Sequence, residues 1–207
     1  MGKLFLSVLF LSYVTSAWAS DLEAQYDLLA QVKANQAEYQ IALQAGQDRS
    51  TLCGYCHGKD GNSIKQDVPN LAGQNPEYLL HQFDLFGTGL RKNYVMERLA
   101  KVVTPEERVN IALYYASLKV KVVDGATTSA RGEEVYQSFC FACHGENGRG
   151  NKDMPRLAGQ QKSFIEKTLR AFKAGKSYRD KSPMVAIMRK INEKDIPELA
   201  AYLSAMK

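Results

Sequence analysis

The sequence has little that would suit a membrane span or a β-sheet, and it has no cysteine outside two short motifs. Its hydrophobic N-terminal segment, Leu4–Ala19, is shorter than the roughly 20 residues that a transmembrane helix needs, and no later segment is apolar for as long. No stretch alternates polar and apolar residues with the period of a strand. Hydrophobic residues make up 45% of the 207 positions and charged residues 24%, which excludes disordered and collagen-like chains. We therefore expect a soluble, helical protein of one ordinary or two small domains.

The first nineteen residues differ from the rest of the chain. A basic residue and an apolar stretch are followed by the small-x-small sequence Ala17–Ala19. This pattern predicts a secretory signal peptide over residues 1–19, so that the mature chain begins at Ser20. An uncleaved membrane anchor is the alternative. Export would place the protein in the periplasm or outside the cell.

All four cysteines lie in two C-x-x-C-H pentapeptides, Cys53–His57 and Cys140–His144. This is the c-type haem attachment sequence. Two thiols about one helical turn apart can form thioethers to a haem, and the adjacent histidine can then ligate the iron. A thioredoxin-like pair would need an α/β context, and a zinc ribbon would leave the histidines without a role. The motifs predict two haem c groups held by Cys53, Cys56, His57, Cys140, Cys143 and His144.

The chain contains an internal repeat. The second motif follows the first by 87 residues, Pro155–Gln160 follows Pro69–Gln74 by 86, and Leu199–Met206 follows Ile111–Leu118 by 88. Repeats of this kind indicate two copies of one module. The predicted divisions are a signal peptide (1–19), an N-terminal helical extension (20–45), a first domain (46–119), a linker (120–130) and a second domain (131–207).

Helical patterns recur in both copies. Apolar residues have helical spacing over 78–86 and 164–172. Thr104–Glu107 has the features of a capping box with proline at the first helical position, which predicts a helix through Leu118. Asn192–Met206 is its counterpart in the second copy.

The extension is rich in Ala, Gln, Leu and Glu and has no proline. It predicts one added helix with Leu22, Tyr26, Leu29 and Val32 on one face. Packing on the first domain is the favoured role of that face, and docking to a partner or the membrane is the alternative.

Two methionines are placed alike in the repeat. Met96 and Met184 follow the histidine of their own copy by 39 and 40 residues, and each precedes an equivalent tyrosine by 18. Methionine is the second axial ligand that raises the potential of a carrier haem, so we predict that these two complete the iron sites. Residues without a counterpart are expected to have other roles: Met154, Met188, Met206 and His81.

Together these features resemble the dihaem cytochromes c4 of Gram-negative bacteria over about residues 46–207. The resemblance implies an all-α fold of two tandem class I cytochrome c domains, each around one covalent haem, and a role in electron transfer rather than catalysis. It implies that the carbonyls of Pro69 and Pro155 accept the Nδ1–H of the two haem histidines.

The resemblance also implies that Gly132 and Tyr136 lie on a short helix that crosses the last helix near Tyr202. The first copy keeps the glycine as Gly46 but has Ser50 in place of the aromatic residue. We expect another tyrosine to compensate, and the two candidates are Tyr39 and Tyr115.

An iron with histidine and methionine ligands has no open position for a substrate, which favours a carrier. The prediction is a periplasmic electron carrier between respiratory donors and a terminal oxidase or reductase. Its expected partners are a cytochrome bc1 complex, a haem-copper oxidase or a periplasmic dehydrogenase. A dedicated electron-accepting subunit of such a dehydrogenase, for example thiosulfate dehydrogenase, is the alternative. A dihaem enzyme would need an exchangeable or unusual iron ligand.

Charge is distributed unevenly between the two halves. Residues 20–124 hold 11 basic and 13 acidic groups, a balance of −2, whereas residues 125–207 hold 15 and 9, a balance of +6. This asymmetry predicts that the second domain faces an acidic redox partner or associates peripherally with the inner membrane, and nucleic acid is not an expected partner. Charge reversal at Lys173, Lys176 and Arg179 in the second domain is therefore expected to slow electron exchange more than charge reversal at Lys59, Lys65 and Lys101 in the first.

Overall fold

The structure, a computed structural model, describes residues 21–122, 127–175 and 182–207. Within these ranges the chain forms eleven helices and no strand, apart from one isolated β-bridge between Asn151 and Met154. The all-α prediction is therefore confirmed. The predicted signal peptide and its cleavage site lie outside the described residues, as do Lys176 and Arg179.

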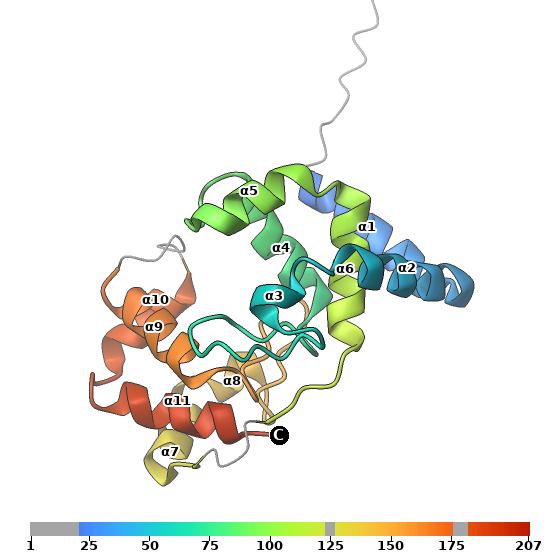
Figure 1. Cartoon of the computed structure of the whole chain (residues 1–207). Coiled ribbons are helices and arrows are strands. Elements are labelled where there is room, and N and C mark those ends of the chain that lie inside the picture. The colour runs from blue at the N-terminus through green and yellow to red at the C-terminus, as the bar shows by residue number, and fades with distance from the viewer. Residues whose placement is uncertain (1–20, 123–126, 176–181) are drawn as a thin grey trace, which may run out of the picture.

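The helices fall into two modules that lie side by side (Figure 1). An apolar cluster occupies the core of each module. The helices of the first are α1 (Asp21–Ala34), α2 (Gln36–Arg49), α3 (Gly54–His57), α4 (Pro76–Gly87), α5 (Tyr94–Val102) and α6 (Pro105–Ser117). Those of the second are α7 (Ala130–Phe139), α8 (Phe141–His144), α9 (Lys162–Lys173), α10 (Pro183–Lys190) and α11 (Asp195–Ala205).

The helices α2 to α6 match α7 to α11 one for one, in the same order. The predicted helices over 78–86 and 164–172 correspond to α4 and α9, and the capping box of Thr104 and Glu107 is formed at the start of α6. Both predictions are confirmed. Helix α1 has no counterpart in the second module.

The prediction of a single helix over the extension is wrong, because two helices, α1 and α2, form there. Asn35 has an extended backbone and its side chain accepts hydrogen bonds from the backbone N–H groups of Ala37 and Glu38, so it ends α1 and caps α2. Helix α2 continues to Arg49, and the boundary expected at residue 46 therefore falls inside it. The repeat could not indicate this because α2 has 14 residues whereas α7 has 10.

The apolar face of α1 packs on the first module, as the favoured interpretation of the extension required. Leu29 and Val32 are buried, and Leu22 and Tyr26 pack against the same core at its edge. The Tyr26 hydroxyl also reaches Asp153 of the second module at 3.3 Å. Helix α1 thus contacts both modules.

Helices α2 and α6 of the first module cross at a glycine, as do α7 and α11 of the second. A Cβ atom on Gly46 would lie 2.1 Å from the carbonyl oxygen of Asn110, and one on Gly132 would lie 2.2 Å from that of Glu198. No other residue leaves room for such an approach between two backbones. The crossing near Tyr202 that the family resemblance implies is present, since its ring lies 5.7 Å from that of Tyr136.

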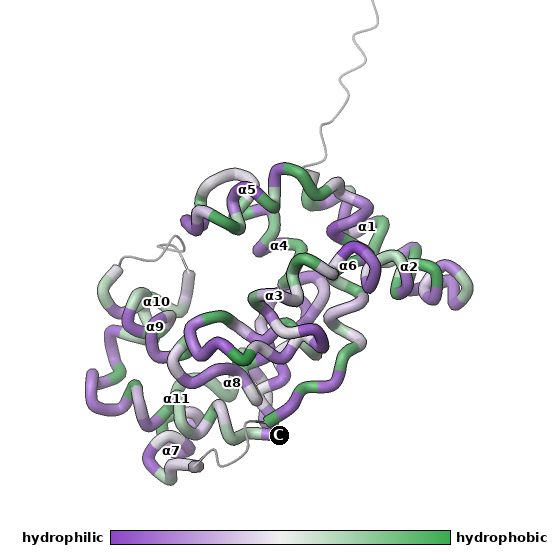
Figure 2. The backbone as a smooth tube through the Cα atoms, in the orientation of Figure 1, coloured by the Kyte–Doolittle hydropathy of each residue, from purple (hydrophilic) through white to green (hydrophobic). Residues whose placement is uncertain are grey.

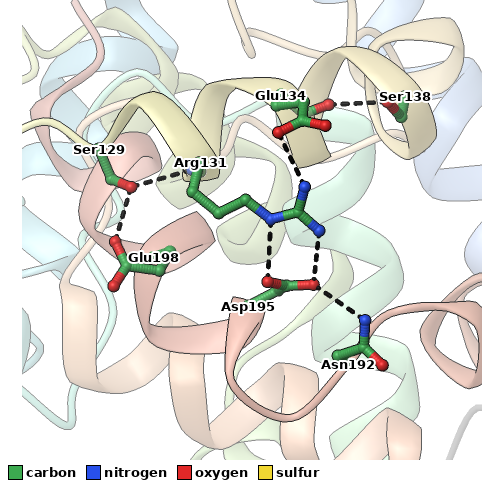
Figure 3. Close-up of polar contacts among 8 residues, drawn as sticks. Ser129, Arg131, Glu134, Ser138, Asn192, Asp195 and Glu198 are labelled. Carbon is green, nitrogen blue, oxygen red and sulfur yellow. Dashed lines mark hydrogen bonds and ion pairs between the residues drawn. The ribbon is translucent and has the colours of Figure 1, made fainter.

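An ion pair and a hydrogen bond join α7 and α11 in the second module (Figure 3). The Arg131 guanidinium donates two hydrogen bonds to the buried Asp195 carboxylate, at 3.0 and 2.9 Å. Ser129 caps α7 by accepting from the Gly132 N–H, and its hydroxyl donates to Glu198 on α11. These contacts fix the N-terminal turn of α7 against that of α11.

Hydrophilic and hydrophobic residues are interspersed along the helices (Figure 2). None of the helices formed by residues 21–122, 127–175 and 182–207 has both the length and the apolar character of a transmembrane span.

Candidate functional site

The two C-x-x-C-H motifs form equivalent one-turn helices, α3 and α8. The first cysteine of each motif is the N-cap residue, and its carbonyl accepts the N–H of the histidine four residues later, at 2.9 Å for His57 and 3.0 Å for His144. One helical turn therefore separates the first cysteine from the histidine, and the second cysteine lies within the same turn. Each module thus gathers two thiols and an imidazole in five residues.

The thiols differ in exposure in the same way in both modules. Cys140 is buried and Cys53 half-buried, whereas Cys56 and Cys143 are exposed. Burial raises the pKa of Cys140 to about 12 and also raises that of Cys53. A thioredoxin-like redox pair needs the opposite shift, toward a thiolate at neutral pH. Cys53 and Cys140 also belong to different cores, which argues against one metal bound by both pairs.

Each histidine ring is fixed by a proline carbonyl. The Nδ1 atom of His57 lies 2.9 Å from the carbonyl oxygen of Pro69, and that of His144 lies 3.0 Å from that of Pro155. A proton on Nδ1 leaves Nε2 as the atom available to a metal, and such a partner also sets the plane of the ring. Burial lowers the pKa of His57, which favours the neutral imidazole that coordination requires.

Met96 and Met184 occupy the first turns of matching helices, α5 and α10. The Met96 N–H donates to the Asn93 side chain at 3.0 Å, and the Met184 N–H donates to the Ser182 side chain at 3.3 Å. Both methionines are half-buried. Sequence reasoning selected these methionines by spacing but missed the capping residues, although an Asn or Ser ahead of each helix was a usable signal.

The other methionines and the third histidine have individual surroundings. Met188 is fully buried in the second core, Met206 packs at its edge, and Met154 is exposed. His81 is half-buried on α4.

Reciprocal side-chain amide contacts join the two modules between these sites. Gln160 accepts from the Asn70 N–H at 2.7 Å and donates to the Asn70 carbonyl at 3.0 Å. Gln74 makes the same pair with Arg156, at 2.7 and 3.1 Å. Gln74 and Gln160 are equivalent in the repeat, as are Asn70 and Arg156, so the contact has the form of a two-fold interface within one chain.

A second reciprocal pair lies beside the first. Asn75 donates to the carbonyl of Arg149 at 3.2 Å, and Gln161 donates to that of Ser63. Sequence reasoning missed this interface, although the repeated strings that end in Gln74 and Gln160 were recognised. A repeated polar residue does not reveal whether it faces solvent or the other module.

The residues of each module fit a covalently attached haem. Two cysteine sulfurs, an oriented imidazole and a thioether form the donor set of a c-type carrier haem, and each module supplies one complete set. When bound, the haem supplies a reversible one-electron couple at its iron.

Comparison with known proteins gives matches to c-type cytochromes. The family model "Cytochrome c" matches residues 129–207. The cytochrome c4 of Azotobacter vinelandii is 32% identical over 184 residues, which cover 78% of this chain and 88% of that protein. The crystal structure of reduced recombinant cytochrome c4 from Pseudomonas stutzeri matches with a TM-score of 0.71 and 32% identity, over 79% of this chain and 98% of that one.

The chain belongs to the cytochrome c4 family. It is therefore a dihaem c-type cytochrome, an electron-transfer protein rather than an enzyme, and its haems are covalently bound. A further relative is the thiosulfate dehydrogenase electron acceptor of Stutzerimonas stutzeri (strain A1501), which is 27% identical over 86% of this chain and 90% of that protein.

Proposed function

We propose that this cytochrome carries electrons in the periplasm between respiratory donors and a terminal oxidase or reductase. The donors are a cytochrome bc1 complex or a periplasmic dehydrogenase, and the acceptor is a haem-copper oxidase. The observation that carries the proposal is the duplication of a complete ligand set on two modules that are hydrogen-bonded to each other.

In this proposal the first haem is attached to Cys53 and Cys56 and its iron is held by His57 and Met96. The second is attached to Cys140 and Cys143 and its iron is held by His144 and Met184. Pro69 and Pro155 orient the two histidines through the Nδ1 contacts at 2.9 and 3.0 Å. The residue types support this assignment because a histidine and a methionine in each module would give each iron two protein ligands and leave no position for a substrate.

The reciprocal amide contacts have a mechanical role in this function. Electron exchange between two centres depends on their separation, and the contacts of Gln74 and Gln160 hold the modules in one relative position. Gln74, Gln160 and Asn70 are buried at this seam, so shifting one module against the other would break their hydrogen bonds.

A redox titration followed by optical spectroscopy tests the proposal. The purified protein should show two one-electron steps at positive potential, and its oxidised form should show the far-red charge-transfer band of a methionine–iron bond. A high-spin spectrum in the wild-type protein, with an open iron, would contradict the carrier role.

A dedicated electron acceptor of one periplasmic dehydrogenase is the second candidate. The match to the thiosulfate dehydrogenase electron acceptor supports it, because it covers 86% of this chain against 78% for the cytochrome c4 of Azotobacter vinelandii. Reduction by purified thiosulfate dehydrogenase at a rate well above that by a bc1 complex would favour this candidate.

A further inference from the structure

A cleft of about 410 Å³ lies between the two modules, beside the first residues of the linker, Val120 and Val122. Gly73 and Leu118 of the first module contribute to its lining, as do Val120 of the linker and Arg156 of the second module. The cleft exists only when the modules are docked, because each supplies one of its walls.

The charged side chains that line the cleft are all basic: Lys119, Arg149, Arg156 and Lys207. None of the four forms an ion pair with a carboxylate in the part of the chain that the structure describes. Nearby cations are paired, for example Lys121 with Asp60 at 2.5 Å. These four side chains therefore bring positive charge to the cleft, and no acidic side chain of the described residues pairs with them.

Arg156 is held in place at both ends. Its backbone N–H donates to Gln74 across the seam at 2.7 Å, and its Nε–H donates to the carbonyl of Ala158 at 3.1 Å. Burial lowers the pKa of Arg156, and the neighbouring Arg149 lowers it further. Both causes disfavour a charged guanidinium with no anion beside it, and a bound anion would relieve both.

Val120, the first residue of the linker, packs closely against both modules at the edge of the cleft. Gly73 and Gly159 have positive φ angles of +62° and +70°, and a Cβ atom on either would lie 2.6 Å from a methyl carbon of Val120. Val120 is thus wedged between equivalent glycines of the two modules. Asn62 fixes the neighbouring residues by donating to the carbonyl of Lys119 and accepting from the N–H of Lys121.

We propose that this cleft binds a phosphate- or sulfate-like oxyanion at the seam between the modules. The fixed guanidinium of Arg156 supplies directed hydrogen bonds, and Lys119, Arg149 and Lys207 supply charge. The bound anion contacts both modules and the linker, so it stabilises the docked arrangement by mass action. The oxyanion is either free in solution or the phosphate of an anionic lipid.

Calorimetric titration of the holoprotein tests the site. The probes are sodium sulfate and sodium phosphate, added against chloride at constant ionic strength so that general screening is unchanged. The cleft variant is Arg149→Gln/Arg156→Gln. The control is Lys162→Gln/Lys167→Gln, which removes the same charge from exposed positions on α9.

We expect wild type and control to bind sulfate equally and the cleft variant to bind it at least about tenfold more weakly. Sulfate at ten times its Kd should raise the Tm of the wild type by about 3–6 °C and leave that of the cleft variant unchanged. Arg149→Gln alone provides a second test, because the Arg149 side chain is exposed and its loss leaves the hydrogen bonds of Arg156 intact.

Vesicle binding separates the two sources of the anion. If free anions fail to bind but phosphatidylglycerol vesicles bind wild type and control and not the cleft variant, the ligand is a lipid phosphate. Phosphatidylcholine vesicles should bind none of the proteins. Equal affinities in all three proteins, or no binding of anions or vesicles, would overturn the proposal.

Discussion

The buried tyrosine of the second module lies on α7, whereas that of the first module lies on α6. Tyr136 of α7 is buried and donates to the carbonyl of Gly145. The first module has Ser50 at that position, and Tyr115 of α6 is the buried aromatic residue there, with 1% of its surface exposed. The repeat places Leu203 opposite Tyr115. Each helix crossing therefore has one buried tyrosine, but the two modules supply it from opposite helices of the crossing pair.

The ion pairs between the same helices differ in a similar way. Glu107 and Asp195 are equivalent in the repeat, and each pairs with an arginine on the crossing helix, α2 or α7. The partner is Arg49 in one module and Arg131 in the other, one helical turn apart when the helices are aligned. The two modules of this chain therefore share the helix crossing but differ in the residues that stabilise it.

The crossing glycines should give the largest effect in either module. Gly46→Ala and Gly132→Ala should each destabilise their own module by about 3 kcal/mol, because the added Cβ would lie about 2 Å from a carbonyl oxygen. Thermal unfolding followed by circular dichroism and limited proteolysis would measure this. Gly87→Ala is the control, since its Cβ would meet nothing closer than 3.8 Å. A Gly46→Ala protein as stable as that control would show that the two crossings are not equivalent.

Replacing individual methionines should distinguish those that ligate an iron from one that only packs in the core. Met96→Ala and Met184→Ala should each keep both haems, lower the potential of one iron and allow carbon monoxide to bind that iron when reduced. Met188→Ala should instead cost about 2 kcal/mol of stability without opening an iron, because Met188 is fully buried. The ligand assignment fails in whichever module does not bind carbon monoxide after its methionine is replaced.

The sequence allowed prediction of those elements that depend on local patterns or on the repeat. The capping box at Thr104 is a local signal, and the pairing of Gly46 with Gly132 follows from the repeat. The break at Asn35 was missed because its neighbours are good helix formers and a single capping residue is a weak signal. The sequence left both Tyr115 and Tyr39 as candidates for the aromatic residue that compensates for Ser50, because the choice depends on which side chain reaches the space beside Ser50.

The seam between the modules was beyond sequence reasoning for a different reason. Gln74 and Gln160 are polar and follow glycine, which suits an exposed loop as well as an interface. Their burial results from docking of one module on the other, and no local pattern encodes it. Lys173 was expected at a surface that meets a partner. Its ammonium group instead donates to the carbonyls of Met188 and Ile191, at 3.1 and 2.5 Å.

Acid stability should reveal the ion pair of the second module. Arg131 lowers the pKa of Asp195 to about 2, whereas an aspartate in an unfolded chain titrates near about 3.9. A depressed carboxyl pKa contributes stability that is complete above about pH 4 and is lost as the pH falls toward 2. Asp195→Asn should remove this pH dependence from unfolding curves, whereas Glu134→Gln, which alters only the exposed partner of Arg131, should retain it.

Surface charge should produce the smallest difference between the modules. Lys173 is engaged in hydrogen bonds, and Lys176 and Arg179 lie outside the described residues. The comparison therefore uses exposed lysines. Lys162, Lys167 and Lys190 are changed to Glu in the second module, and Lys59, Lys65 and Lys101 in the first. Reversal in the second module should slow electron exchange with an acidic partner more. Stopped-flow rates should also fall between about 10 mM and 150 mM salt, as the screening length shortens from about 30 Å to 8 Å. Equal effects in both modules would remove the argument for polarity.

Intact-mass spectrometry after acid denaturation tests the central claim most directly, because only covalent haem survives that treatment. The wild-type protein should have the mass of the chain from Ser20 onward plus two haems. Cys53→Ala/Cys56→Ala and Cys140→Ala/Cys143→Ala should each carry one. A wild-type protein with one haem or none, or a double variant that keeps two, would contradict the account.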